Sequence, residues 1–296
     1  MLISQKLEEM MVKYQDSRST ISKYLLEQRL KLEHFTMQQI ADETFTSKAT
    51  LVRVAKKLGY PGWNNFFKAY MDELKYKQTH FSEISHNYPF KRGDSTQKIL
   101  DNICQLRMES TWQTARLMDL EALNQSARLL VRSRRITLFG ISTNQLLLEI
   151  FRRKMLTIGK HTDIIHQAET ALYASSLTAE DCAIMVSYSG NNERRNPMNL
   201  LNRLKENHVP VIAITSMGDN YLRQNADHVL TIFSQERLYS KISTFSTEAS
   251  IEYILDVLFS CCFALDYDKN LQYKISSSKS VEIHRYSELQ EVRETD

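Results

Sequence analysis

The sequence predicts a two-domain protein in which an all-helical domain precedes an α/β domain built on a doubly wound parallel sheet. The chain has 296 residues, a length typical of two domains. Apolar residues in the first 80 positions recur at helical spacing, whereas short apolar runs alternate with helix-length segments after residue 135. Strands separated by helices form βαβ units, and these units build parallel sheets that helices cover on both faces.

The N-terminal domain is expected over residues 1–80 as a set of helices, each marked by an apolar stripe. The stripes contain Ile21, Tyr24, Leu25 and Leu26; Met37, Ile40 and Ala41; Leu51, Val54, Ala55 and Leu58; and Phe66, Phe67 and Tyr70. Pro89 and Gly93 interrupt this spacing, which resumes at residue 96. Residues 81–109 are therefore interpreted as a linker and a connecting helix.

The α/β domain is expected over residues 110–270, and residues 271–296 are expected to form a C-terminal tail. The polar segment from residue 266 is interpreted as either a short last element or a loose tail. Strands are predicted at 136–141, 161–165, 183–186, 209–214 and 229–233. Helices are predicted at 144–158, 168–178, 193–206, 219–225 and 246–265.

Composition excludes several classes of protein. The net charge is only +3, so a uniformly basic coat is absent and any nucleic-acid surface must be local. No apolar stretch reaches the length of about 20 residues that a membrane span needs, and the N-terminus lacks an apolar signal segment, so a cytoplasmic location is expected. The four cysteines follow no metal-ligand spacing and are expected to be buried, reduced thiols: Cys104, Cys182, Cys261 and Cys262.

A helix-turn-helix is predicted between Thr36 and Gly59. Thr36 is placed to cap a first short helix and Ser47 to cap a second, with residues 44–46 as the connection. Gly59 is placed to end the second helix in a left-handed conformation. In this motif the N-terminal part of the second helix enters the major groove of DNA.

The charge pattern of the second helix suits a nucleic-acid partner. Residues 44–71 contain five basic side chains and no acidic one. Short polar groups and an arginine near a helix start suit base edges, whereas lysines suit phosphates. The residues expected to contact DNA are Ser47, Lys48, Ala49, Thr50, Arg53, Lys56 and Lys57. Taken alone, the charges are more typical of a solvated basic helix with no partner, and it is the two caps, their spacing and the acid-free window that favour DNA.

Residues 20–72 carry further markers, which are the pair Ile40–Ala41, the recognition-helix residues Ser47, Thr50 and Arg53, the stretch LGYPGW, and Phe66–Phe67. With these markers the segment resembles the N-terminal domain of the RpiR/MurR family of bacterial transcriptional regulators. The resemblance implies sequence-specific DNA binding. Phe45 departs from the family, in which a small residue is usual, and the change is expected to affect the packing of the turn.

Two loops of small polar residues follow predicted strands. The first is GISTN at 140–144 and the second is SYSGNN at 187–192, and each is expected to precede a helix. A strand, a glycine- and hydroxyl-rich turn and a helix N-terminus together supply donors for an anion, usually a phosphate. In an open parallel sheet, ligands bind at the carboxyl ends of the strands. The alternative is that these hydroxyls only cap helices.

Residues 110–270 resemble a sugar isomerase (SIS) domain, a doubly wound sheet that binds phosphosugars. The segment MVSYSGNNER is similar to the family's serine-rich loop, and LFGISTNQ is a weaker match to its first loop. The resemblance implies a ligand site at Ser142, Thr143, Ser187, Ser189, Gly190 and Asn192. Asn144, Asn192 and Glu248 depart from the family pattern, and an acid at 248 beside a phosphate would repel it. Arg194 and Arg195 are expected in a first helical turn, where they are placed to neutralise an anion or to lie on a solvated surface.

Three functions follow from these patterns. The leading one is a DNA-binding transcriptional regulator of sugar-metabolism genes, controlled by a phosphorylated sugar or amino sugar. The alternatives are a phosphosugar isomerase with an accessory helical domain and a sugar-blind, SIS-assembled DNA-binding protein. An isomerase needs a positioned base, and the candidates are His161, His166, Glu169, His228 and Glu248.

None of these candidates lies in a catalytic motif, so no catalytic residue is assigned, and neither a cofactor nor a metal is expected. The expected macromolecular partner is a double-stranded DNA operator, and no membrane partner is expected. Because a palindromic operator requires a symmetric protein, a homodimer or homotetramer is expected.

Overall fold

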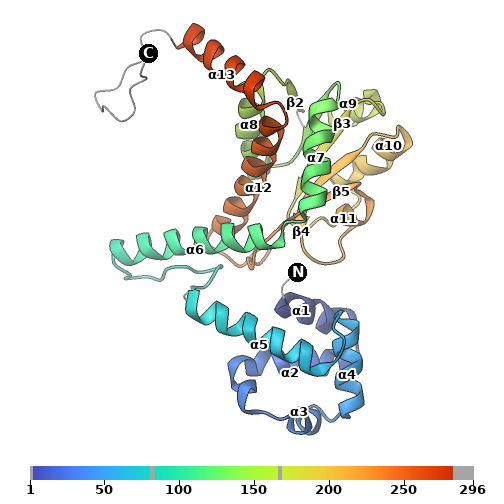
Figure 1. Ribbon diagram of the computed structural model, residues 1–296, viewed down its shortest axis with the longest axis vertical. Coiled ribbons are helices and arrows are strands. Elements are labelled where there is room, and N and C mark those ends of the chain that lie inside the picture. The colour runs from blue at the N-terminus through green and yellow to red at the C-terminus, as the bar shows by residue number, and fades with distance from the viewer. Residues whose placement is uncertain (1–2, 81–83, 166–168, 283–296) are drawn as a thin grey trace. The chain divides into compact units, whose positions relative to one another are not determined.

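The computed structural model describes residues 3–80, 84–165 and 169–282. It divides into two compact units. Unit 1 comprises Met1–Leu117, Ser216–Asn220 and Thr231–Ser250, and unit 2 comprises Met118–Thr215, Tyr221–Leu230 and Ile251–Asp296. The predicted fold class is confirmed, because the N-terminal region is helical and the C-terminal region is a parallel sheet with helices (Figure 1).

The N-terminal helices share one apolar core. They are α1 (Ile3–Lys13), α2 (Ser17–Gln28), the 3-10 helix η1 (Arg29–His34), α3 (Met37–Glu43), α4 (Lys48–Lys57) and α5 (Trp63–His80). The stripes predicted from the sequence meet here, and the buried residues include Ile21, Leu25, Ile40, Leu51, Val54, Phe66 and Tyr70. The hydroxyl of the buried Tyr70 donates to the Leu25 carbonyl (3.1 Å). This bond satisfies the polar atom of an aromatic side chain that otherwise only packs.

The start of α1 is held by a residue 69 positions away. The Ser4 N–H donates to the Glu73 carboxylate of α5 (3.1 Å), and the Ser4 hydroxyl and the Ile3 N–H donate to the same group. The first N–H groups of a helix have no partner within the helix, so a carboxylate there both satisfies them and complements the helix dipole.

The segment expected to be a linker is partly folded into unit 1. His86 Nδ1 lies 3.1 Å from the Ser246 hydroxyl, and the Ser110 hydroxyl of α6 (Thr96–Leu117) donates to that same oxygen (2.7 Å). The Ser246 N–H donates to Glu236 Oε1 (2.6 Å), and the Glu236 side chain is fully buried. A buried polar cluster of this kind rigidifies the segments that it joins.

The α/β region is built on a five-stranded sheet of order β2-β1-β3-β4-β5. The strands are β1 (Ile136–Phe139), β2 (Thr162–Ile164), β3 (Cys182–Ser187), β4 (Val211–Ser216) and β5 (His228–Ile232). β1 pairs in parallel with β2 and β3, and β3 pairs in parallel with β4. All four residues of β1 are buried, as expected for a central strand of a sheet that is covered on both faces.

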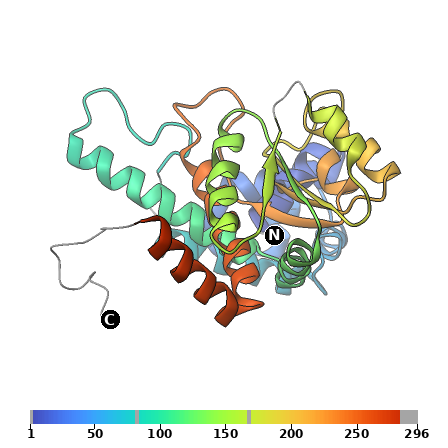
Figure 2. The same cartoon turned by 90° about the horizontal axis from the view of Figure 1, so that it is seen from above.

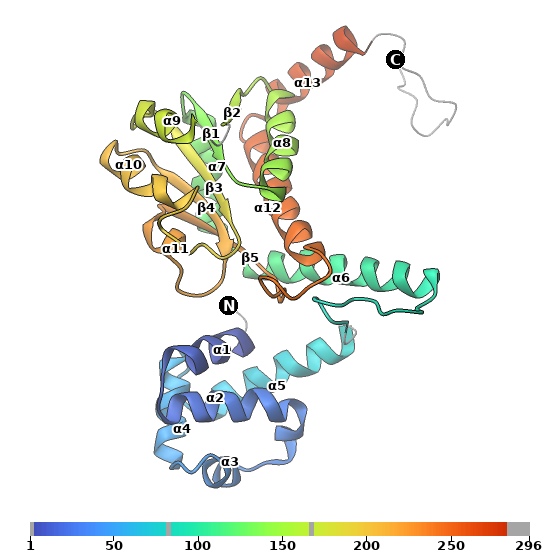
Figure 3. The same ribbon diagram turned by 180° about the vertical axis from the view of Figure 1, so that it is seen from behind.

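Helices cover both faces of this sheet. The helices that follow α6 in the chain are α7 (Leu120–Arg132), α8 (Thr143–Leu156), α9 (Thr170–Ser176), α10 (Leu201–Glu206), α11 (Tyr221–Asn225), α12 (Phe245–Ala264) and α13 (Tyr267–Val281). One core joins α9, α10 and α11 to Phe139, Ala183, Met185, Val211 and Ala213 of the strands. Figure 3 shows these three helices on one side of the sheet, with α8 and α12 on the other.

One sequence expectation for this region is wrong. The helix expected at 193–206 begins only at Leu201, after a turn and a short 3-10 helix at Met198–Leu200. Pro197 explains the delay, because proline lacks an N–H and disfavours a helical residue before it. Of the two interpretations of the C-terminal segment, the structure has the short last element, because residues 267–281 form the helix α13, red in Figure 2.

The expectation of four buried thiols is only partly met. Cys182 and Cys262 are buried, Cys261 is half-buried, and Cys104 is exposed on α6; all four are free. Burial raises the pKa of the Cys182 thiol to about 11 and that of Cys262 to about 12, so both are unreactive thiols. Among the residues that the structure describes, no helix is both long and apolar enough to cross a membrane.

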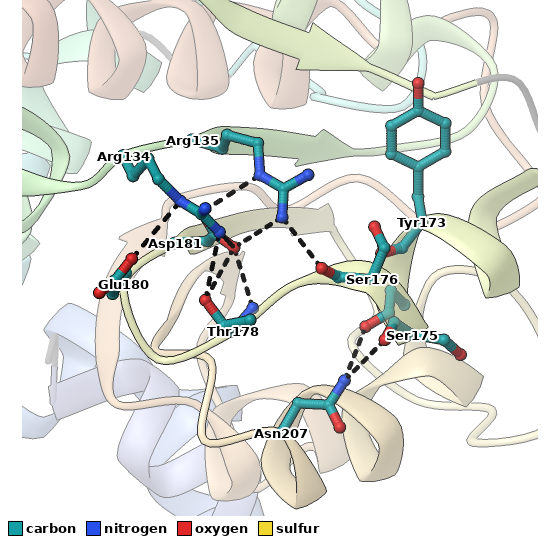
Figure 4. A network of polar contacts seen from close by, with 10 residues as sticks. Arg134, Arg135, Tyr173, Ser175, Ser176, Thr178, Glu180, Asp181 and Asn207 are labelled. Atoms are coloured by element: carbon teal, nitrogen blue, oxygen red, sulfur yellow. Dashed lines mark hydrogen bonds and ion pairs between the residues drawn. The ribbon is translucent and has the colours of Figure 1, made fainter.

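A buried carboxylate ties together the amino ends of β1 and β3 (Figure 4). Asp181, whose side chain is fully buried, accepts from Nε and Nη2 of both Arg134 and Arg135 at 3.0–3.2 Å. The Thr178 N–H and hydroxyl donate to the same carboxylate (2.9 and 3.2 Å). These donors outweigh burial and hold the pKa of Asp181 well below its usual range.

Candidate DNA-binding surface and effector loops

The helix-turn-helix predicted from the sequence is formed by α3 and α4. Thr36 caps α3, and Gln39 completes a capping box with it. Ser47 caps α4, its hydroxyl accepting from the Thr50 N–H (3.2 Å). Gly59 has a φ of 93° and follows the last turn of α4, where its N–H donates to the Lys56 carbonyl. The Tyr60 N–H donates to the Ala55 carbonyl, which completes the left-handed C-cap expected at Gly59.

The candidate DNA contacts lie on the open side of α4. Leu51, Val54 and Ala55 are buried. Of the seven candidates, Thr50 is half-buried. The other six are exposed, namely Ser47, Lys48, Ala49, Arg53, Lys56 and Lys57. Arg53 Nη2 donates to the Thr50 hydroxyl (3.0 Å). All seven therefore remain at least partly accessible to a partner, and the bond to Thr50 holds Arg53 close to the N-terminal turns of the helix.

Phe45 does not take part in packing the turn, contrary to the sequence expectation. Its side chain is 96% exposed, and its φ is 53°. The turn needs a left-handed residue at this position, and a phenylalanine adopts that conformation only at a cost.

The two polar loops of the α/β region lie at the same edge of the sheet. β1 and β3 are parallel neighbours in which Phe139 pairs with Met185, so the loops that follow them emerge side by side. Asn144 Nδ2 donates to the Val186 carbonyl (3.3 Å) and links the first loop to the end of β3. Asn144, a departure from the family pattern, thus has a structural bond that the sequence did not reveal.

The first loop presents a helix start that its own serine does not cap. Ser142 has a φ of 55° and makes no side-chain bond to the N–H groups of α8. Gly140 is closely packed, because a β-carbon there would lie 2.9 Å from the Leu148 side chain, which would have to shift. Ser142 is exposed and Thr143 is half-buried. The explanation that these hydroxyls only cap a helix therefore does not apply to Ser142.

The second loop is held by bonds to its backbone. The Gly190 N–H donates to the Ser187 hydroxyl (3.3 Å), and the Gly190 carbonyl accepts from the Leu222 N–H (2.9 Å). Gly190 and Asn192 both have positive φ, 59° and 74°. Ser187 and Ser189 are half-buried, Gly190 is buried and Asn192 is exposed.

Arg194 and Arg195 lie in the turn that follows this loop and are exposed. The prediction that they occupy a first helical turn is wrong, because Pro197 disfavours a helix there and α10 begins only at Leu201.

Four of the five candidate catalytic bases lie among the residues that the structure describes. His161 precedes β2, at the edge of the sheet opposite the polar loops, and is exposed. Glu248 accepts a hydrogen bond from the Thr244 hydroxyl at the start of α12. Glu169 is exposed, and His228 is half-buried at the start of β5. His166 lies outside the residues that the structure describes.

A helix-turn-helix with an exposed, basic recognition helix, joined in one chain to an α/β domain, defines a DNA-binding transcriptional regulator. Residues 1–76 match the family model of the helix-turn-helix domain of the rpiR family, and residues 129–255 match the SIS domain. The chain belongs to the rpiR family of transcriptional regulators and carries a C-terminal SIS domain.

Relatives agree with this assignment. An uncharacterized HTH-type transcriptional regulator of Clostridium perfringens is 24% identical over 279 residues, which cover 94% of this chain and 98% of the relative. The uncharacterized HTH-type transcriptional regulator YfhH of Escherichia coli is 26% identical over 246 residues, which cover 82% of this chain and 85% of the relative.

Solved structures share the fold. The Vibrio vulnificus NanR protein complexed with ManNAc-6P has a TM-score of 0.57 at 19% identity, covering 96% of this chain and 99% of NanR. The sugar isomerase domain of an RpiR transcription factor from Sphaerobacter thermophilus has a TM-score of 0.55 at 16% identity, covering 62% of this chain and 99% of that domain.

Proposed function

We propose that this regulator binds operator DNA through α4 and that a phosphorylated sugar or amino sugar, bound at the loops after β1 and β3, changes that binding. The observation that carries the effector proposal is the parallel pairing of β1 with β3, which sets both polar loops at one edge of the sheet. Ligands of open α/β sheets bind at this edge.

The first loop offers the phosphate a helix start. α8 has 14 residues, and the side chain at its N-cap is not bonded to its free N–H groups. Such a start attracts anions through its N–H donors and its dipole. The hydroxyls of Ser142 and Thr143 add further donors beside it.

The second loop offers hydroxyl and amide groups. We assign phosphate contacts to Ser187, Ser189 and Asn192, with Gly190 allowing close approach of the backbone. The NanR structure was solved with ManNAc-6P, a phosphorylated amino sugar. The likeness of fold to NanR supports the same chemical class of effector here.

On the DNA side, we assign base contacts to the start of α4 and phosphate contacts to its end. Thr50 and Arg53 lie near the N-cap Ser47, together with Lys48 and Ala49, where the recognition helix of this motif reaches base edges. Lys56 and Lys57 lie in the last turn, where side chains contact phosphates.

Binding to a palindromic operator needs a symmetric assembly, and we propose a homodimer or homotetramer. Exposed apolar residues on α6, Leu100 at 59% and Met108 at 65%, support self-association through that helix. Sedimentation analysis that returns only monomers at micromolar concentration would contradict this part of the proposal.

The DNA test begins with selection of an operator from a random pool of DNA duplexes by the wild-type protein. Lys48→Ala and Arg53→Ala should each weaken binding to the selected operator by about 1–3 kcal/mol, the usual value of a base contact. The Lys56→Ala, Lys57→Ala double variant should weaken binding to all sequences alike and flatten the salt slope by about 1.8, or about 0.9 for each phosphate contact. If all these variants bind as the wild type does, α4 is not the recognition helix.

The effector test uses calorimetry with a panel of hexose, hexosamine and pentose phosphates, each compared with the unphosphorylated sugar. Ser189→Ala should lower the affinity of the bound phosphosugar about tenfold or more, since a hydrogen bond to a charged group is worth about 1.5–3 kcal/mol. Its DNA binding without ligand should stay intact. Ser260→Ala is the matched control, because this exposed serine of α12 donates to the Asp256 carbonyl of its own helix (2.8 Å) and lies far along the chain from both loops.

Linkage supplies a second measure of the same coupling. A phosphosugar that loosens DNA must itself bind more weakly to the DNA-bound protein, by the same factor. If no phosphosugar binds below millimolar concentration, the α/β domain is sugar-blind and serves assembly.

We further propose that the protein is not an isomerase. Purified protein should not interconvert aldose and ketose phosphates. Turnover well above background that Glu169→Gln or Glu248→Gln abolishes would overturn this proposal and favour the enzyme.

A further inference from the structure

A groove beside the recognition helix adds residues that the sequence did not single out for DNA. It has a volume of about 330 Å³ and runs between the start of α2 and one side of α4. Asp16, Ser17 and Arg18 line it from α2, and Thr50, Arg53 and Lys57 line it from α4. The groove therefore continues the surface that carries the candidate DNA contacts.

The side chains of the groove favour an anion. Arg18, Arg53 and Lys57 are cations, and Asp16 is the one carboxylate among the described residues that line it. Within the part of the chain that the structure describes, Arg53 and Lys57 have no carboxylate partner at ion-pair distance. Two helices thus aim positive charge into one groove, which is the arrangement by which proteins hold nucleic-acid phosphates.

Asp16 holds Arg18 in place inside the groove. The Arg18 guanidinium donates through Nε and Nη2 to both carboxylate oxygens of Asp16, at 2.6–3.1 Å. It also lies 3.4 Å from the centre of the Tyr14 ring. Asp16 is at the same time the N-cap of α2, where it accepts from the Arg18 N–H (2.9 Å). The bond to Arg18 lowers the pKa of Asp16 to about 2, so the carboxylate is charged at neutral pH.

We propose that this groove receives one backbone phosphate of the bound DNA, held by Arg18 and Lys57, and that Asp16 competes with that phosphate for Arg18. The inference rests on the proposed binding of DNA through α4, which borders the groove. Arg53 also lines the groove and adds positive potential to it, while its assigned contact is with the bases. Because a phosphate contact carries no sequence information, the groove contributes equally to operator and non-operator DNA.

The first test compares Arg18→Ala with Lys23→Ala, at an exposed cation of the same helix that pairs with Glu27. Affinity is measured by fluorescence anisotropy on the selected operator and on an arbitrary 30-base-pair duplex, between 50 and 200 mM salt. Arg18→Ala should weaken both complexes about tenfold and lower the salt slope by about 0.9. Lys23→Ala should change neither. If Arg18→Ala and Lys23→Ala change the DNA affinity and the salt slope equally, the proposal that the groove binds a phosphate is wrong.

The second test gives a gain of affinity, which misfolding cannot produce. Asp16→Asn keeps an effective N-cap and removes one negative charge. It should tighten both complexes about threefold at low salt, the factor expected when one unit charge about 6 Å from a phosphate is removed in water. Glu27→Gln makes the same change of charge about 16 Å further along α2, at 1.5 Å per residue, and should have little effect.

The outcomes of these two tests distinguish a failure of the groove proposal from a failure of the proposed function. If Asp16→Asn binds the two duplexes no more tightly than the wild type does, Asp16 does not compete with a phosphate for Arg18. If Arg53→Ala weakens operator binding while Arg18→Ala does not, α4 contacts DNA but the groove does not. If the wild-type protein binds no duplex, both proposals fail.

Discussion

Asp181 offers the sharpest test of what holds the α/β region together. Replacing it with asparagine keeps its size and removes one acceptor oxygen and the charge. Oδ1 accepts two of the six hydrogen bonds and Oδ2 accepts four. An asparagine that keeps its oxygen at the Oδ2 position loses the bonds from Nε of Arg134 and of Arg135.

The expected cost is about 2 kcal/mol. Two hydrogen bonds to charged groups are worth about 3–6 kcal/mol when they are buried. Arg134 and Arg135 are 54% and 39% exposed, so water replaces part of what they lose and the estimate is reduced accordingly. For a region of this size, the loss corresponds to a melting temperature lower by about 5 °C.

The loss should also depend on pH. The pKa of Asp181 lies below its unfolded value, so its contribution is complete above about pH 5 and is lost as the pH falls through the folded pKa. With an unfolded pKa of about 3.9, the difference between wild type and Asp181→Asn should shrink by about 0.7 kcal/mol at pH 3.5. The difference in unfolding free energy between wild type and Asp181→Asn should therefore narrow as the pH falls.

The assay is urea unfolding at pH 7.0 and pH 3.5, read by hydrogen exchange of peptides that span β1 and β3. Glu180→Gln is the matched control, because Glu180 is 75% exposed and lies 3.6 Å from Arg134 Nε. It should cost less than about 0.5 kcal/mol, as surface ion pairs do. If Asp181→Asn costs no more than this control, or if the gap stays constant with pH, the buried ion pair does not stabilise the sheet.

Two further predictions concern backbone and packing. Phe45→Gly should stabilise the N-terminal helices by about 1 kcal/mol, because glycine adopts the φ of 53° freely and the ring is 96% exposed. Urea unfolding followed by tryptophan fluorescence measures this gain, and Phe45→Ala should not show it; equal effects would exclude backbone strain. Gly140→Ala should cost about 1–3 kcal/mol and weaken phosphosugar binding, because the added methyl group meets Leu148 at 2.9 Å. Gly62→Ala, with nothing within 4 Å, should be neutral, and a neutral Gly140→Ala would show that α8 shifts without cost.

The helix-turn-helix could be predicted because its signals are local. Thr36, Ser47 and Gly59 act within a few residues of their own helix ends, and the apolar stripes between them show directly which sides of the helices are buried. The order of strands and helices could likewise be predicted from the apolar runs. The helix expected at 193–206 begins only at Leu201, because Pro197 disfavours an earlier start.

The tertiary structure decided which distant residues meet. The cap of α1 by Glu73, the bond from Asn144 to Val186 and the pairing of Asp181 with two arginines each join segments far apart in the chain. Such pairings depend on strand order and on the angle at which helices pack, which no local pattern contains. For the same reason, the sequence pointed to a basic recognition helix, while only the packing of α2 on α4 placed Arg18 and Asp16 beside it.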